Sequence, residues 1–255
     1  MQKTVSNDGT EIAFDTVGEG PAVIVIGGAM NTRHSPYPLV TLLGEQFAVT
    51  TYDRRGRGDS TDVAPYAVER EIEDLGALID ATGGSAMVYG HSSGAILTLE
   101  AAAAGLPITR VAVYEPPYTG GSGDPTEPDT AVADALAAGD RDAATAGFMR
   151  LTGMPDGQIE WMRHSDFWPD LVALAHTLPY DLALSGDGIA PAERLSLITV
   201  PTLAMNGGAS DPWAALAADA VVAAVANGER ETLAGQTHQV DQAVLAGSLG
   251  AFFGR

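Results

Sequence analysis

The residues best suited to chemistry lie at positions 90–94, where Gly-His-Ser-Ser-Gly matches the pattern G-x-S-x-G. An apolar run precedes this segment, and an alanine-rich helical pattern follows it. A serine on a sharp turn from a strand into a helix exposes its hydroxyl, and small residues on either side allow the turn to be tight. The helix dipole favours negative charge at the same point. The segment therefore predicts Ser92 as a nucleophile.

A serine hydroxyl is a weak nucleophile until a base takes its proton. Of the five histidines, His238 has the most suitable place, in a loop between the last predicted strand and the terminal helix. His91 lies inside the motif, His34 follows the first glycine turn, and His164 and His176 fall in a helical region. We predict that His238 is the general base.

The base needs a carboxylate on its other ring nitrogen, which holds the tautomer and stabilises the imidazolium. Asp211 is the first choice, because it follows a predicted strand and a glycine turn. Proline comes next, so Asp211 could instead cap the helix that begins there. Glu115, which directly follows residues 108–114, is the second candidate acid, with shaping of the pocket mouth as its alternative role.

Acyl transfer also needs N–H donors where negative charge develops on the substrate oxygen. The backbone N–H of Ser93 is one predicted donor, because it directly follows the nucleophile. The second donor is expected in the Gly-Gly-Ala-Met segment at residues 27–30, where two glycines allow the backbone to approach closely. Ala29 is favoured for this role and Gly28 is the alternative. Gly28 and Met30 are also expected to border the pocket.

The elements that must position these residues alternate along the chain. We expect strands at residues 10–17, 22–26, 47–52, 85–89, 108–114, 202–205 and 230–233, and helices at 68–81, 93–104, 214–226 and 240–253. Such alternation predicts βαβ units in a mostly parallel sheet that helices cover on both faces.

Between the two alternating parts, the pattern is helical only. A loop rich in Gly, Pro and Asp at 120–128 leads to helices at 131–138 and 142–151, and residues 167–184 contain two prolines that divide them into short helices. We therefore expect an α/β core from residues 1–118 and 196–255, and a helical insertion from residues 119–195. Its aromatic and methionine side chains, including Trp161 and Trp168, could line a pocket for an apolar acyl group.

The composition excludes several classes of protein. There is no cysteine, and 13 basic residues face 33 acidic ones, for a formal net charge of −20. Thiol chemistry and disulfides are excluded, and nucleic acids or anionic membranes would be repelled. No secretory leader or membrane-spanning run is visible, so we expect a cytoplasmic protein. No metal-ligand cluster or phosphate-cradling loop is found, and we expect no cofactor.

These features together resemble the α/β-hydrolase superfamily, in the region of small esterases, lactonases and cofactor-free perhydrolases. The resemblance rests on residues 90–94, the turn at 52–60, the Asp211 loop and His238, and it spans nearly the whole chain. Family members typically carry His-Gly where this chain has Gly27-Gly28. The resemblance implies an α/β-hydrolase fold, a cap (lid) at 119–195 and a structural role for the arginine-rich turn. Serine at position 92, in place of aspartate, argues against epoxide hydrolase and haloalkane dehalogenase chemistry.

The sequence thus predicts an enzyme that cleaves a small carboxylic ester or lactone of apolar character through Ser92, His238 and an acyl-enzyme. The same residues would also suit a thioesterase, a perhydrolase or a C–C hydrolase. A protein of another class, which keeps the fold for ligand binding or a cyclase-like role and forms no acyl-enzyme, is the remaining alternative.

Overall fold

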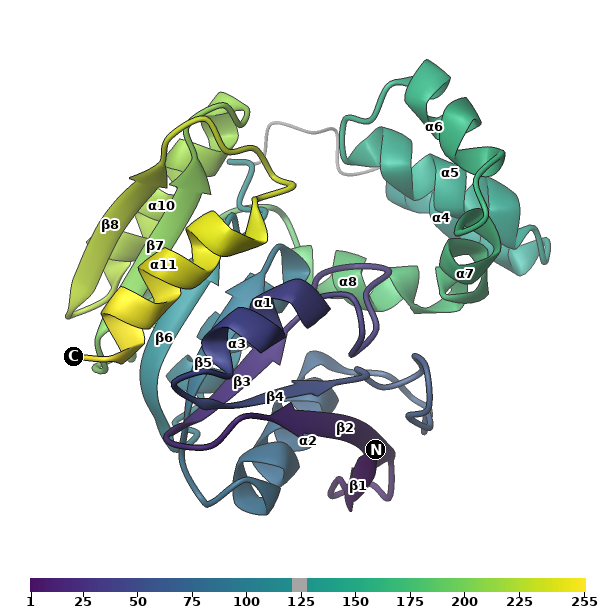
Figure 1. Ribbon diagram of the computed structural model, residues 1–255. Helices are drawn as coiled ribbons and strands as arrows, with labels where there is room; N and C mark the ends of the chain where they lie inside the picture. The colour runs from purple at the N-terminus through teal and green to yellow at the C-terminus, as the bar shows by residue number, and fades with distance from the viewer. Residues whose placement is uncertain (121–127) are drawn as a thin grey trace.

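The computed structural model describes residues 1–120 and 128–255. Eight of the described segments are strands of a single sheet in the order β1-β2-β4-β3-β5-β6-β7-β8 (Figure 1). The strands are β1 (Gln2–Val5), β2 (Glu11–Val17), β3 (Ala22–Ile26), β4 (Ala48–Tyr52), β5 (Ala86–His91), β6 (Ile108–Tyr114), β7 (Thr202–Gly207) and β8 (Gly228–Leu233). The first two pairings, β1 with β2 and β2 with β4, are antiparallel, and all the others are parallel. The carboxyl ends of β3, β5, β6 and β7 therefore meet at one edge, where open α/β sheets place their sites.

Helices cover both faces of the sheet, as the alternating pattern predicts. The helices α1 (Tyr37–Leu43) and α11 (Gln242–Phe253) pack on one face, where Leu43 and Phe252 are buried in one apolar cluster. The helices α2 (Val68–Ala81), α3 (Ser93–Ala103) and α10 (Pro212–Ala224) cover the other face. The central strand β3 supplies Val23 and Val25 to the first cluster and Ile24 and Ile26 to the second. Alternate side chains of a strand point to opposite faces, so this wholly apolar strand is buried on both sides.

A second group of helices follows β6 and precedes β7 along the chain. It contains α4 (Pro128–Ala137), α5 (Arg141–Leu151), α6 (Asp156–Arg163), α7 (Trp168–Ala173), the short 3-10 helix η1 (Ala175–Thr177), α8 (Leu178–Ser185) and α9 (Ala192–Leu195). In Figure 1, α4 to α7 stand together to one side of the sheet, and α8 lies between them and the sheet. We call residues 128–195 the insertion. Its last part, with Leu184 and Leu195, packs in the same cluster as α3.

The bounds of the alternating strands and helices agree closely with the sequence predictions. The strand at 22–26 and the helix at 68–81 have the expected bounds, and residues 167–184 contain short helices. The pattern gave no indication of β1, α1, α6 or α9, which are short. The predicted loop at 120–128 lies outside the described residues except at its two ends. No described helix has the length and apolar character needed to cross a membrane.

Candidate active site

Ser92 lies on a tight turn between β5 and α3, and its backbone is strained. Its φ of 56° and ψ of −124° are an unusual conformation for a residue with a side chain. The flanking residues must be glycine, because a Cβ at either position would collide with neighbouring backbone atoms. A Cβ at Gly90 would lie 2.2 Å from the carbonyl oxygen of Gly94, and one at Gly94 would lie 2.5 Å from that of Ile26. The turn therefore has the geometry that presents a nucleophilic serine at the N-terminus of a helix.

His238 forms a hydrogen bond with a carboxylate, and that carboxylate belongs to Glu115. The distance from His238 Nδ1 to Glu115 Oε2 is 2.7 Å. A carboxylate only accepts hydrogen bonds, so Nδ1 carries the proton, which leaves Nε2 of a neutral imidazole free to accept one. This pairing gives the histidine the tautomer that a general base needs.

Glu115 is fully buried and follows β6 directly, with a φ of 47°. Its second oxygen, Oε1, accepts hydrogen bonds from the Gly207 N–H at 2.8 Å and from the Ser210 hydroxyl. Burial raises the pKa of Glu115, but the hydrogen bonds from His238, Ser210 and Gly207 outweigh it and hold the pKa below its ordinary value. The carboxylate is therefore ionised when it faces His238.

The structure corrects the first choice of acid. Asp211 is exposed, and it is the N-cap residue of α10, without a hydrogen bond from its side chain to the helix. It follows the turn at 207–210, and this turn directs Ser210 towards Glu115 while Asp211 continues into the helix. The alternative stated for Asp211, the start of a helix, is what the structure shows. Glu115, the second candidate, has the position beside His238.

His91 brings the histidine loop to the Ser92 turn. Its Nε2 lies 3.1 Å from the carbonyl oxygen of His238, and the two rings are 4.7 Å apart. A carbonyl only accepts, so Nε2 of His91 is the donor. Burial, followed by repulsion from His238, lowers the pKa of His91 to about 3. His91 is therefore a neutral donor at ordinary pH, and it ties the residue before Ser92 to the backbone of His238.

The glycine segment after β3 lies against Ser92. A Cβ at Gly28 would be 2.9 Å from Cβ of Ser92, so only glycine fits there without displacing the serine. Among the described residues, neither the Ser93 N–H nor the Ala29 N–H donates a hydrogen bond to another residue. Met30, with a φ of 57°, packs against the apolar clusters of the insertion. The loop at 27–31, named here the glycine loop, thus lies between Ser92 and the insertion.

The two tryptophans named as possible pocket residues have different surroundings. Trp168 is buried in an apolar cluster of the insertion, and its Nε1 donates to Asp142 at 2.7 Å. It therefore stabilises the insertion from within. Trp161 is 68% exposed on α6. The contacts of the described residues do not join either side chain to Ser92 or His238.

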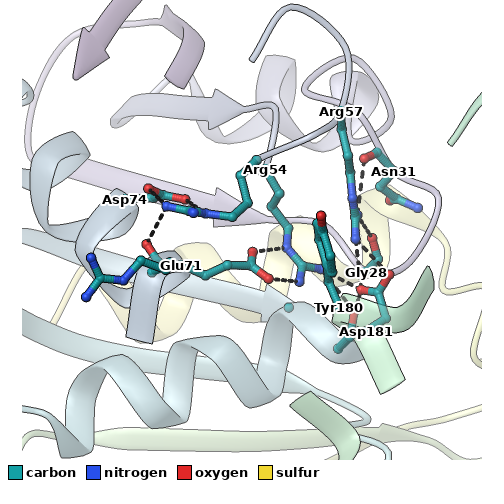
Figure 2. A network of polar contacts seen from close by, with 12 residues as sticks. Gly28, Asn31, Arg54, Arg57, Glu71, Asp74, Tyr180 and Asp181 are labelled. Carbon is teal, nitrogen blue, oxygen red and sulfur yellow. Dashed lines mark hydrogen bonds and ion pairs between the residues drawn. The ribbon is translucent and has the colours of Figure 1, made fainter. Parts of the chain in front are cut away.

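The arginine-rich turn is buried and holds its charges within the protein. Arg54, Arg55 and Arg57 are each at most 2% exposed, and all three bind carboxylates. Figure 2 shows Arg54 beside Glu71 and Arg57 beside Asp181. Such guanidinium groups are not presented to a phosphate, which agrees with the structural role that we expected. In the described part of the chain, no group of three or more His, Asp or Glu residues is arranged to hold a metal ion.

Comparison with known proteins identifies the family. The model of the alpha/beta hydrolase family matches residues 23–252, which is most of the chain. The protein belongs to this family. An α/β-hydrolase from Sphaerobacter thermophilus DSM 20745 is similar over 99% of this chain and 100% of its own, with 47% identity and a TM-score of 0.93. The family and these likenesses establish the protein as a hydrolase with the expected fold.

Two further relatives are more distant. The enol-lactonase from Burkholderia xenovorans LB400 shares the fold of this hydrolase over 100% of both chains, with 21% identity and a TM-score of 0.73. The uncharacterised hydrolase YraK of Bacillus subtilis (strain 168) is 30% identical over 101 residues. That match covers 38% of this chain and only 37% of YraK, a little over a third of the curated relative.

Sequence reasoning missed three residues of the site. Ser210 binds Glu115, and Trp213 lies with its ring 6.1 Å from that of His238. Asp181, on α8, accepts a hydrogen bond from the Ser93 hydroxyl at 2.7 Å. Ser210 directly precedes Asp211 and Trp213 is two residues after it, so sequence reasoning named this region but not these two side chains. Asp181 lies 88 residues from Ser93 in the chain, and no local pattern marks it.

Proposed function

We propose that this hydrolase cleaves small carboxylic esters or lactones with an apolar acyl group through a covalent acyl-enzyme. The observation that carries the proposal is the His238–Glu115 hydrogen bond at 2.7 Å, in a loop that His91 ties to the strained turn of Ser92. A nucleophile, a base and a carboxylate on the far nitrogen of that base are the parts of a serine hydrolase triad.

In the proposed reaction, Nε2 of His238 takes the proton of the Ser92 hydroxyl as its oxygen attacks the carbonyl carbon. Glu115 stabilises the imidazolium that results, and the N–H groups of Ser93 and Ala29 donate to the oxyanion. The tetrahedral intermediate collapses, and His238 gives its proton to the leaving alcohol oxygen. Water then attacks the acyl-enzyme, with His238 again taking and returning a proton, and the carboxylic acid leaves.

The insertion is proposed as a cap that supplies the apolar side of the pocket. Ala29, whose N–H is a proposed oxyanion donor, and Met30 pack against a cluster of insertion residues that includes Val132 and Leu178. Phe148 and Leu182 pack against the same cluster. An acyl chain that leaves the oxyanion position on this side would meet apolar surface, which favours ester groups with some hydrocarbon character.

The test combines covalent labelling with turnover. A fluorophosphonate probe should label the wild-type protein at Ser92, and a panel of p-nitrophenyl esters of graded chain length, with lactones and thioesters, should identify the preferred bond. Ser92→Ala should lose both labelling and turnover while its thermal unfolding midpoint stays near that of the wild type. Ser35→Ala, at an exposed serine, is the matched control and should keep both. Ester hydrolysis that survives in the Ser92→Ala variant would contradict the mechanism.

A further inference from the structure

A buried polar network joins the insertion to the residue after the nucleophile and to the glycine loop. Figure 2 shows the part of this network formed by Asp181, Arg57 and Gly28. Asp181, on α8, is 2% exposed. It accepts hydrogen bonds from Arg57 Nη2 at 2.7 and 2.9 Å, from Arg54 Nη1 at 2.7 Å and from the Ser93 hydroxyl at 2.7 Å. Arg57 Nη1 in turn donates to the carbonyl oxygen of Gly28 at 2.7 Å. One carboxylate of the insertion thus contacts the residue after the nucleophile directly and the glycine loop through Arg57.

The bond to the Gly28 carbonyl fixes more than that oxygen. The carbonyl of Gly28 and the N–H of Ala29 belong to one planar peptide group, and this peptide is trans. In a trans peptide, the C=O and the N–H point in opposite directions. When Arg57 holds the oxygen, the Ala29 N–H is therefore aimed away from the arginine. Among the described residues, Arg57 is the only side chain that donates to this carbonyl. The one backbone donor to it is the Asn31 N–H, at 3.4 Å.

Arg57 is itself held from the insertion. Its Nη2 binds both oxygens of Asp181, while Arg54 binds Glu71 through two hydrogen bonds of 2.6 Å. Two guanidinium groups and two carboxylates, each at most 2% exposed, therefore balance one another. Without Asp181, Arg57 would have no carboxylate partner in the described chain, and a buried unpaired charge is driven to move or to admit water. Arg57 thus binds the Gly28 carbonyl with one nitrogen and its carboxylate partner, Asp181, with the other.

Further contacts dock the same part of the insertion on the arginine-rich turn. The ring of Tyr180 stacks on that of Tyr66 with centroids 3.9 Å apart, and its hydroxyl donates to Asp62 at 2.6 Å. His176 lies with Nε2 2.9 Å from the carbonyl oxygen of Gly56. Ring stacking and hydrogen bonds thus hold the segment that carries Asp181 on the core, beside the bonds of Asp181 itself.

We propose that Asp181 and Arg57 are positioning residues that set the direction of the Ala29 N–H, so that the oxyanion site is complete only while α8 is docked. This inference rests on the proposed function, because it concerns the donors of the acyl-transfer reaction. It assigns the insertion a part in the chemical step as well as in forming the pocket.

The test compares two ways of removing the link. Asp181→Asn leaves Arg57 without its counter-charge, and it is the direct variant. Arg57→Met with Asp181→Leu removes one positive and one negative charge together and leaves Arg54 paired with Glu71, and such apolar replacement of a buried pair often preserves stability. Loss of an oxyanion donor typically lowers kcat by about 10²–10³-fold, and misdirection of one should lower it by about 10–100-fold with little change in KM. The affinity for butylboronic acid, which forms a tetrahedral adduct with the serine, should fall in parallel.

Asp74→Asn is the matched control. Asp74 binds Arg55 of the same turn through two hydrogen bonds of 2.8 Å and is 1% exposed, but it has no contact with Asp181 or the glycine loop. It should lower the thermal midpoint and leave kcat within about twofold of the wild type, because the bond to Gly28 is intact. In proton NMR spectra, the downfield resonance of the His238 Nδ1 proton, which is hydrogen-bonded to Glu115, should persist in every variant. The loss of kcat would then arise at the oxyanion donors and not at the base.

Three results would overturn the proposed role of Asp181 and Arg57. A folded Asp181→Asn protein or double variant with wild-type kcat overturns the inference, as does an equal loss of kcat in Asp74→Asn. Disappearance of the His238 resonance would place the defect at the base and would also overturn it. If the wild-type protein itself shows no ester turnover and no fluorophosphonate labelling, the proposed function fails first, and that result is seen before any variant is made.

Discussion

The loops that follow β6 and β7 leave the same edge of the sheet, and each carries a carboxylate, yet the two carboxylates have different surroundings. Glu115 begins the β6 loop in a left-handed conformation and is fully buried. Asp211 comes four residues after the end of β7, at the exposed start of α10. The β7 loop contributes hydrogen-bond donors, the Gly207 N–H and the Ser210 hydroxyl, to the carboxylate of its neighbour. One loop thus supplies the charge and the other holds it in place.

The largest effect is expected from Glu115→Gln, which keeps the size of the side chain and removes its charge. Without the carboxylate, the imidazolium is not stabilised and the tautomer of His238 is no longer fixed, so kcat should fall by about 10³–10⁴-fold. Steady-state hydrolysis of the best p-nitrophenyl ester measures this, with thermal unfolding as the check on folding. Near-normal kcat in this variant, with a collapse in Asp211→Asn, would reverse the roles of the two loops.

A smaller effect is expected from His91→Phe, which tests the hydrogen bond that ties His238 to the turn of Ser92. Phenylalanine preserves a ring beside His238 and Tyr114 but removes the donor to the His238 carbonyl. Loss of one hydrogen bond of about 1 kcal/mol should lower kcat about fivefold. Because the pKa of His91 is about 3, the ring is neutral throughout the working range, and the pH–rate profile should keep its shape. A changed profile would show that His91 itself titrates during catalysis.

Ser210→Ala tests the support that the β7 loop gives to Glu115. The pKa of Glu115 is held below its ordinary value of 4.5, so its ionised form stabilises the fold fully above that pH, and this stability is lost as the pH falls through the lowered pKa. Removal of the Ser210 hydrogen bond raises the pKa and should cost about 1–2 kcal/mol near pH 7. Urea unfolding at a series of pH values should show the difference between the two proteins narrow below about pH 4.5. A difference that does not change with pH would mean that Ser210 acts independently of the carboxylate.

The contrast between the two loops also explains what could be predicted from the sequence. Local patterns predicted Ser92 and His238 as site residues. A serine between two glycines after an apolar strand, and a histidine before the last helix, are both marked by their neighbours. The same local reasoning favoured Asp211, which has a glycine turn before it and a proline after it. Those signals describe the start of a helix. The direction of a side chain after that start depends on the path of the turn, which the sequence does not specify.

Local sequence patterns also do not show which side chains from distant elements will meet, because that depends on the path of each turn. Glu115 was named as a candidate, but its left-handed backbone conformation is rare for glutamate and is not encoded by its neighbours. Asp181 is one of several acidic residues in the insertion, and only its burial against Arg54 and Arg57 distinguishes it. The fold, which follows from repeated local patterns of apolar residues, was predicted almost completely. The polar contacts between distant elements required the structure.

Asp211→Ala should have the smallest effect, and it completes the comparison. Asp211 is exposed and makes no side-chain hydrogen bond to the start of α10, so its loss should cost less than about 0.5 kcal/mol of stability, below the usual effect of removing a cap. The hydrogen bonds from Gly207 and Ser210 to Glu115 remain, so kcat should stay within about twofold of the wild type. The measurement is ester hydrolysis beside the Glu115→Gln variant under the same conditions. A loss of tenfold or more would show that the charge of Asp211 reaches His238 through the β7 loop. In that case the base would depend on both loops, and the division between a loop that supplies the charge and a loop that holds it would be wrong.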